Sequence, residues 1–123
     1  MPVKFKIKWL RKPEAHDYPA AFSYLSLHYD ARTAAALVKR LKRAPISLFK
    51  AKDIFRASGL SLLGINNSHV KADLKKIKQK CKLAPLLLIR EPANLKVIIA
   101  DGYHRLCAVY SCDEDAVIPC QIA

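Results

Sequence analysis

One short segment of the chain has the residue types and spacing that bind a phosphate group. Asp101-Gly102-Tyr103-His104-Arg105 follows an apolar run at residues 97–100 and opens a stretch with helical spacing. The first backbone N–H groups of a helix have no partner within it, so an anion is favoured there. Gly102 allows close backbone approach, His104 is a further donor, and Arg105 can hold a phosphate through two parallel hydrogen bonds. The segment therefore predicts a phosphate-binding loop.

The same segment also fits a purely structural role. An aspartate before a helix commonly accepts hydrogen bonds from the free N–H groups of the first turn, so Asp101 can be a helix cap. Arg105 then pairs with a carboxylate on the surface and contacts no ligand. The residues alone do not separate this interpretation from phosphate binding, so both stay open.

The cysteines are interpreted as reduced thiols and not as ligands or disulfides. Zinc ligands come in tight pairs, whereas Cys107, Cys112 and Cys120 are loosely spaced around His104. The fourth cysteine, Cys81, is remote from them. The N-terminal run lacks the apolar core and cleavage site of a signal peptide. Because thiols stay reduced in the cytosol, we expect a cytoplasmic protein with no metal site.

The composition favours an anionic partner. The chain has 123 residues, 52% of them hydrophobic, and its 22 Lys+Arg against 10 Asp+Glu give a formal net charge of +12. That length and apolar content suit one domain with its own core. The charge attracts nucleic acids, nucleotides, acidic proteins or anionic lipid head groups. No apolar run approaches the ~20 residues of a membrane span, so we expect a soluble protein.

The elements that must position the loop predict an α+β fold. Residues 1–43 predict a basic strand and two helices, capped by Asp17 and Asp30, as an N-terminal extension. Residues 44–123 predict a core in which a small mixed β-sheet packs with helices, all within a single domain. The predicted core strands are 46–49, 85–89, 95–100 and 117–122, and the predicted helices are 52–58, a helix from Asn67 to Cys81, and one that follows Gly102.

Two basic groups suggest a different function. One lies on the helix after Asn67, outside its apolar stripe, and the other crowds the last turn of the helix after Asp30. Cations at a helix C-terminus also suit the helix dipole, so the group after Asp30 is also explained as a solvated helix end. The alternative function is a non-enzymatic accessory protein that binds DNA or RNA through these side chains and the N-terminal Lys/Arg run. The side chains of the two helices are Lys71, Lys75, Lys76, Lys78, Lys39, Arg40, Lys42 and Arg43.

With its flanking strands, the loop resembles the signature of the ParB/sulfiredoxin superfamily. In that superfamily a strand leads into Gly-x-His-Arg or Gly-Glu-Arg-Arg, and the helix that follows has a small residue three positions on, here Ala108. Residues 46–49, 70–81 and 85–89 resemble the family's first strand, next helix and proline-led strand. The resemblance covers residues 44–123 and leaves 1–43 outside.

The resemblance implies that the loop binds the phosphates of a nucleotide, ATP or CTP with Mg²⁺, or another phosphorylated small molecule. Known members include ATP-dependent sulfinic acid reductases, CTP-hydrolysing DNA-segregation clamps and a serine kinase, so the fold does not fix a reaction. Tyr103 stands at the sulfiredoxins' reactive cysteine, and a phenol with a pKa near 10 is no substitute, so sulfiredoxin activity is not expected. The implied ligand-binding residues are Gly102, Tyr103, His104, Arg105, His69 and Lys71.

A phosphotransferase or hydrolase of this kind needs a general base within reach of the phosphates. Asp101 adjoins the motif and His104 lies in it, and Asp53 and Glu14 are further candidates. Asp53 is equally explained as a cap of its own short helix. We therefore predict ligand binding, and leave the catalytic residues open.

Overall fold

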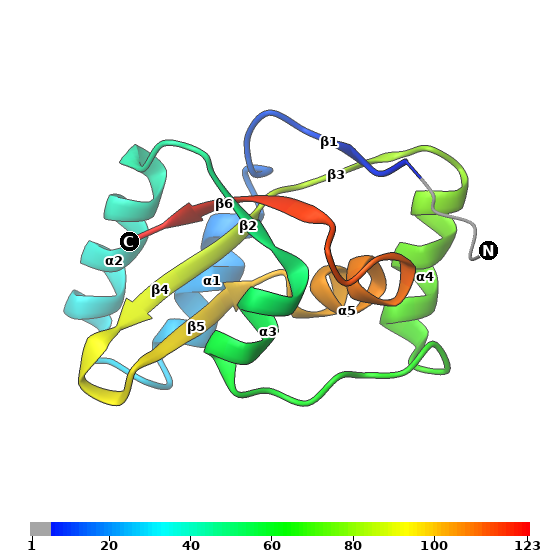
Figure 1. Cartoon of the computed structure of the whole chain (residues 1–123). Helices are drawn as coiled ribbons and strands as arrows, with labels where there is room; N and C mark the ends of the chain where they lie inside the picture. The colour runs from blue at the N-terminus through cyan, green and yellow to red at the C-terminus, as the bar shows by residue number, and fades with distance from the viewer. Residues whose placement is uncertain (1–5) are drawn as a thin grey trace.

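The computed structural model describes residues 6–123, which form a mixed four-stranded sheet with helices packed on both faces (Figure 1). Helices account for 46% and strands for 22%, so the α+β prediction is confirmed. The helices are α1 (Asp17–Leu25), α2 (Ala31–Arg43), α3 (Ala51–Ser58), α4 (Ser68–Lys78) and α5 (Tyr103–Cys112). The strands are β1 (Lys8–Trp9), β2 (Ser47–Lys50), β3 (Lys82–Leu83), β4 (Leu86–Glu91), β5 (Lys96–Asp101) and β6 (Val117–Ile122).

The main sheet has the strand order β2-β6-β4-β5. Strand β6 pairs antiparallel with β2 and parallel with β4, while β4 and β5 form an antiparallel hairpin. A short 3-10 helix, Pro92–Asn94, joins the two hairpin strands. Strand β5 is thus at the edge of the sheet and leads directly into α5. A separate ribbon consists of β1 paired in parallel with β3.

Strand β4 supplies side chains to two cores. Leu86 and Leu88 pack with residues of α3, α4 and α5 on one face of the sheet. Leu87 and Ile89 point to the other face and pack under α1 and α2. Successive strand residues point to opposite faces, so a strand covered on both sides is apolar throughout. This explains the uninterrupted apolar run that the sequence shows at this place.

The N-terminal helices form one of the two layers that cover the sheet. Leu25 of α1 and Val38 and Leu41 of α2 are buried against Ile98 and its neighbours on β5 and β4. Tyr18 adds a polar tie, because its hydroxyl donates to Gln121 Oε1 of β6 at 2.6 Å. Residues 17–43, which lie outside the family resemblance, are therefore part of the protein's core packing.

Two helix starts follow the local sequence. The Asp30 side chain accepts a hydrogen bond from the Thr33 backbone N–H at 2.7 Å and caps α2. The Asn67 side chain accepts from the backbone N–H groups of His69 and Val70 and caps α4. The predicted Asp30 cap is confirmed. Both caps depend only on residues within one turn.

The prediction that Asp17 caps α1 is wrong. The cap position is His16, which makes no side-chain cap hydrogen bond, and Asp17 is the first residue of the helix itself. Its buried side chain instead accepts from the Glu14 backbone N–H at 2.8 Å. The preceding turn offers this donor, and the carboxyl then points into the protein.

Helix α4 ends earlier than the apolar spacing predicts. The helix stops at Lys78, and Cys81, which was expected on its inner stripe, is exposed. Lys80 adopts a left-handed conformation with φ 60°, and the Cys81 backbone N–H donates to the Lys76 carbonyl at 2.9 Å. The chain therefore changes direction at Lys80 and then enters β3.

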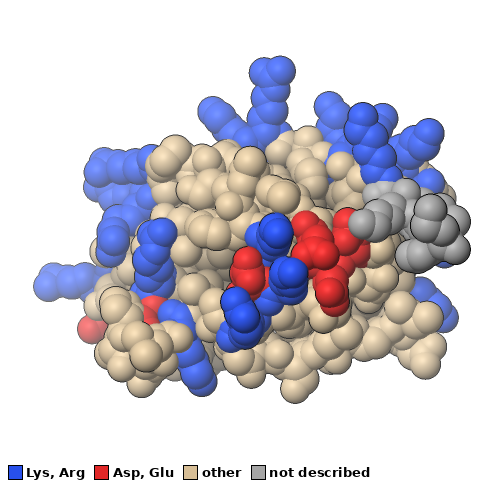
Figure 2. All heavy atoms as spheres, in the orientation of Figure 1, with Lys and Arg blue, Asp and Glu red and all other residues tan. Residues whose placement is uncertain are grey.

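Basic side chains are spread over several edges of the molecule (Figure 2). The two groups singled out in the sequence lie on α2 and α4, at opposite ends of the fold (Figure 1). They therefore do not form one continuous face. Within residues 6–123, no helix combines the length and apolarity of a membrane span.

Candidate phosphate-binding site

The loop at the end of β5 makes a turn that only glycine accommodates. Gly102 has φ 108° and is the N-cap residue of α5. A Cβ at this position would lie 2.8 Å from Leu86 Cγ and 2.9 Å from Arg105 Nη2. Because a side chain is strained at this φ and would also collide with buried atoms, the turn depends on the missing Cβ.

The first turn of α5 keeps backbone donors free of side-chain caps. Gly102 has no side chain to offer, and no side-chain cap hydrogen bond forms at this helix start. The opening N–H groups of a helix lack carbonyl partners within it, here those of Tyr103, His104 and Arg105. At α4, by contrast, the Asn67 side chain occupies two of these donors. The start of α5 is therefore the stronger place for an anion.

Arg105 pairs within the protein. Its Nη2 donates to Asp101 Oδ2 at 2.8 Å and lies 3.4 Å from the Pro85 carbonyl oxygen, and both charged side chains are 17% exposed. Its Nε is buried without a partner. The expectation of a purely structural role is thus correct in part. Arg105 does pair with a carboxylate, but that carboxylate is Asp101, which is largely buried. The Asp101 side chain does not cap α5, because it pairs with the guanidinium of Arg105, which lies one helical turn later in the chain.

A second carboxyl from α1 lies beside this pair. Burial raises the pKa of Asp101, the neighbouring Asp17 carboxyl raises it further, and Arg105 opposes the rise. Asp17 itself is buried, with a side chain only 3% exposed. The cluster of Asp17, Asp101 and Arg105 therefore joins the N-terminal layer to the strand–helix turn.

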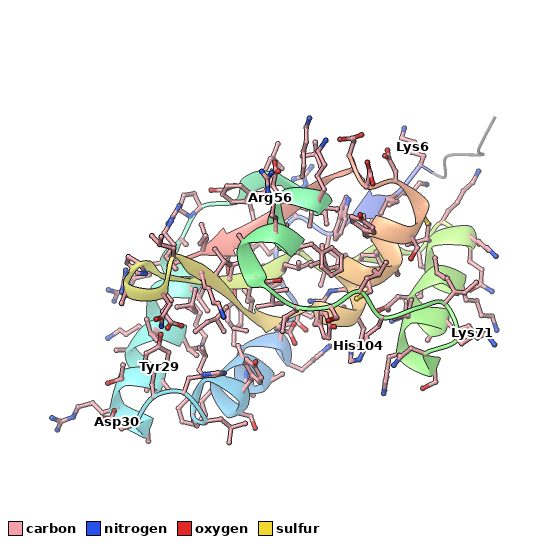
Figure 3. All side chains as sticks on the ribbon, turned by 60° about the horizontal axis from the view of Figure 1, so that its bottom comes forward. Lys6, Tyr29, Asp30, Arg56, Lys71 and His104 are labelled. Atoms are coloured by element: carbon pink, nitrogen blue, oxygen red, sulfur yellow. The ribbon has the colours of Figure 1, made fainter. Side chains whose placement is uncertain are left out.

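Two histidines bring the starts of α4 and α5 together. The rings of His69 and His104, each in the first turn of its helix, have centroids 4.7 Å apart. Figure 3 shows His104 on the α4 side of α5, with Lys71 further out on α4. Burial lowers the pKa of His104, and the nearby His69 lowers it further. Asp73 opposes this fall, and the net lowering favours the neutral form of His104.

Asp73 is the functional candidate that the sequence reading missed. Its side chain is only 13% exposed and lies 3.9 Å from Lys76 Nζ. Burial raises the pKa of Asp73, while Lys76, Arg105, His104 and His69 oppose the rise. The signal was present in the sequence, because residues four and seven apart on a helix share a face. His69, Asp73 and Lys76 have that spacing.

Tyr103 and Cys107 hold the far side of the turn. The Tyr103 hydroxyl donates to the Ser61 carbonyl oxygen and so ties the loop before α4 to α5. Burial raises the pKa of Tyr103 and that of the Cys107 thiol. Cys107 is fully buried, which confirms that it is a small core residue. Both groups stay protonated near neutral pH and are poor nucleophiles.

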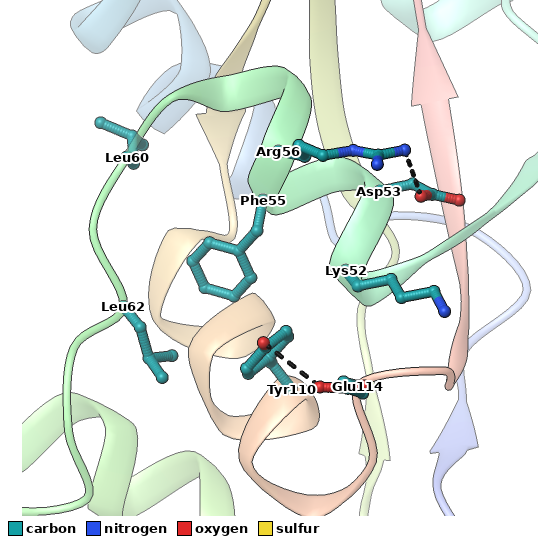
Figure 4. A pocket seen from close by; sticks show the side chains of 8 residues that line it. All are labelled: Lys52, Asp53, Phe55, Arg56, Leu60, Leu62, Tyr110 and Glu114. Carbon is teal, nitrogen blue, oxygen red and sulfur yellow. Dashed lines mark hydrogen bonds and ion pairs between the residues drawn. The ribbon is translucent and has the colours of Figure 1, made fainter.

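Asp53 and Glu14 are not part of this cluster. Asp53 pairs with Arg56 at 3.2 Å and lines a separate open hollow of about 700 Å³ between α3, the loop after it and the end of α5 (Figure 4). In that hollow Phe55 packs edge-on against Tyr110. Glu14 is exposed and its nearest ionisable partner is His16. Neither carboxylate makes a contact with His69, His104 or Arg105 among the hydrogen bonds and ion pairs of the described residues.

The described residues contain no ready metal site. Within residues 6–123, no three His, Cys, Asp or Glu side chains gather where they could hold an ion. All four cysteines are free thiols, and burial raises the pKa of Cys120 to about 12. The site at the loop therefore consists of backbone donors, two histidines, a buried ion pair and Asp73.

In comparisons with known proteins, no family model, curated protein or solved structure matches this chain. The resemblance to the ParB/sulfiredoxin superfamily stays a prediction from the residues themselves.

Proposed function

We propose that this protein binds a phosphorylated small molecule, with a nucleotide as the leading candidate, where the first turns of α4 and α5 meet. The contact between His69 and His104 carries the proposal, because it places two imidazoles beside the uncapped start of α5. Free N–H groups and a helix N-terminus attract an anion, and each imidazole adds a donor. The resemblance to the ParB/sulfiredoxin motif points independently to the same loop.

Each residue at the loop has a distinct part in the proposal. The backbone N–H groups of residues 103–105 and the two histidines contact the phosphate. Arg105 is a positioning residue, since its guanidinium is engaged with Asp101 and holds the turn. Lys71, which is exposed on the same helix as His69, is available for a second phosphate of the ligand.

A triphosphate such as ATP or CTP binds together with Mg²⁺. The described residues fit a site in which the protein supplies only a small part of the magnesium coordination. Magnesium is usually bound by one or two carboxylates together with substrate phosphates. Asp73 is the carboxylate at this site; burial raises its pKa, and the neighbouring Lys76 is the first of the groups that oppose the rise. Binding is better supported than catalysis. If a phosphoryl group is transferred, Asp101, which adjoins the loop, remains a candidate base. Reduced thiols favour a cytoplasmic setting.

The test is calorimetric titration of ATP, CTP, GTP and pyrophosphate into the wild-type protein and into His69→Gln/His104→Gln. We expect at least one of these ligands to bind the wild type, and the double variant to bind it about tenfold more weakly, the loss typical of hydrogen bonds to a charged group. His28→Gln is the matched control, because His28 is exposed and packs only against Tyr24 and Tyr29. Equal affinity in the double variant and the wild type overturns the proposal.

A further inference from the structure

A second cluster of cations lies at the opposite end of α4 from the histidine pair. A hollow of about 280 Å³ is lined by Lys6, Lys8, Ile77, Lys78 and Lys80. Four of these five residues are lysines, and no acidic side chain of the described chain lines the hollow. Helix α4 has 11 residues, so its two ends are about 16 Å apart. The two clusters are therefore separate sites.

The β1–β3 ribbon aligns lysines on its outer side. Lys8 is paired with Lys82 and Trp9 with Leu83, and the parallel pairing continues through a hydrogen bond from Leu10 N to the Leu83 carbonyl. Alternation turns Trp9 and Leu83 toward the core and leaves both lysines exposed. Figure 1 shows this ribbon beside the end of α4 that carries the lysines of the hollow.

The turn after α4 contributes a lysine where glycine is the favoured residue. Lys80 has φ 60°, the left-handed conformation that ends many helices and suits glycine. A lysine there gives up backbone stability while placing one more charge on the hollow. No ion pair joins the four lysines to an acidic residue of the described chain. Four exposed cations this close together favour an external anion at the hollow.

We propose that this lysine hollow binds the phosphate backbone of a nucleic acid without reading its sequence. Lysine ammonium groups bind phosphates as point charges. The one apolar residue that lines the hollow, Ile77, is aliphatic, so the hollow offers no aromatic ring on which a base could stack. Lysines two positions apart on an extended strand lie about 6.6 Å apart, which makes a row that a phosphodiester chain can follow.

The experiment measures the affinity for a labelled DNA duplex of mixed sequence over a series of salt concentrations by fluorescence anisotropy. Lys8→Gln/Lys80→Gln is compared with Lys39→Gln/Lys42→Gln, which removes the same charge from α2 at the other end of the fold. The hollow variant should bind more weakly, with a salt slope less negative by about 1.8, as expected for two lost phosphate contacts. The α2 variant should retain most of the wild-type slope.

Lys80→Gly separates binding from folding. Glycine suits the left-handed turn, so this variant should melt at a higher temperature and yet bind the duplex more weakly. His69→Gln/His104→Gln should bind the duplex like the wild type, which keeps this site distinct from the nucleotide proposal. Equal losses in the hollow and α2 variants overturn the proposal. The proposal is also overturned if poly-glutamate displaces the labelled duplex as effectively as unlabelled DNA of equal charge. That result would assign the hollow to acidic proteins.

Discussion

Three ionisable side chains from two distant parts of the chain, Asp17, Asp101 and Arg105, meet at the carboxyl end of β5. The Arg105 guanidinium favours the charged form of Asp101, whereas burial and the nearby Asp17 oppose it. Through its hydrogen bond to Asp101, Arg105 stabilises the turn that presents the backbone donors of α5.

Replacing Asp101 with Asn should change how stability depends on pH. The folded-state pKa of Asp101 is raised by burial, so its favourable contribution is fully present below the unfolded pKa of about 3.9 and is lost as pH rises through the folded value. As pH rises through this window, the free energy of unfolding measured by urea denaturation should therefore fall less for Asp101→Asn than for the wild type. Asp53→Asn, on the exposed face of α3, is the control. Parallel pH curves for wild type and Asp101→Asn contradict the assignment.

Anion binding at the histidine pair should strengthen on acidification. Burial and His69 lower the pKa of His104, so its imidazole gains a charge only below about pH 6.5, its ordinary value. Sulfate is a suitable probe, because its charge is constant over this range. NMR titration of the histidine ring signals should show tighter sulfate binding at lower pH and a higher His104 pKa with sulfate bound. A His104 pKa unaffected by saturating sulfate would exclude direct contact.

At the scale of elements, the junction between β5 and α5 depends on one residue without a side chain. In Gly102→Ala the new Cβ meets Leu86 and Arg105, and the backbone is strained at φ 108°. We expect a loss of about 2–4 kcal/mol in the free energy of unfolding, from left-handed strain and overpacking together. Urea denaturation measures it.

Gly64→Ala is the matched control for this turn. A Cβ at Gly64 meets nothing within 4 Å, and Gly64 is not among the residues with positive φ. Its stability should stay close to that of the wild type. If the two alanine variants lose the same stability, the close contact with Leu86 is not what requires glycine at position 102.

Helix α4 places different chemistry at its two ends. Its first turn carries His69 next to α5, and its last turn and the following reversal carry Lys78 and Lys80 beside β1. The apolar side, with Val70 and Ile77 buried, fixes the helix between these neighbours. One short amphipathic helix can thus support two anion sites whose variants are separable.

At the scale of the whole molecule, the N-terminal helices decide whether the sheet is covered. Removal of residues 1–43 exposes Leu87, Ile89 and Ile98, which pack under α1 and α2. We expect the fragment 44–123 to aggregate or to lack a cooperative thermal transition, because one apolar face of its sheet is bare. Size-exclusion chromatography and circular dichroism test this. A monomeric fragment that unfolds cooperatively would show that 44–123 is a self-sufficient core.

Much of the secondary structure could be read from the sequence because its signals are local. Asp30 and Asn67 cap the helices they precede, and each cap needs only donors within one turn. Gly59 ends α3 in the left-handed conformation that favours glycine. The β4–β5 hairpin follows from two apolar runs around a proline-containing turn.

The sequence by itself determined these elements, the loop that joins β5 to α5, and the excess of positive charge. Only the tertiary structure decided which side chains meet. It paired Arg105 with Asp101, brought Asp17 from the N-terminal layer to that pair, and set Lys8 beside Lys80 across the ribbon and turn. Such contacts depend on how whole helices and strands dock through their buried faces, and no local pattern records the partner that docking will supply.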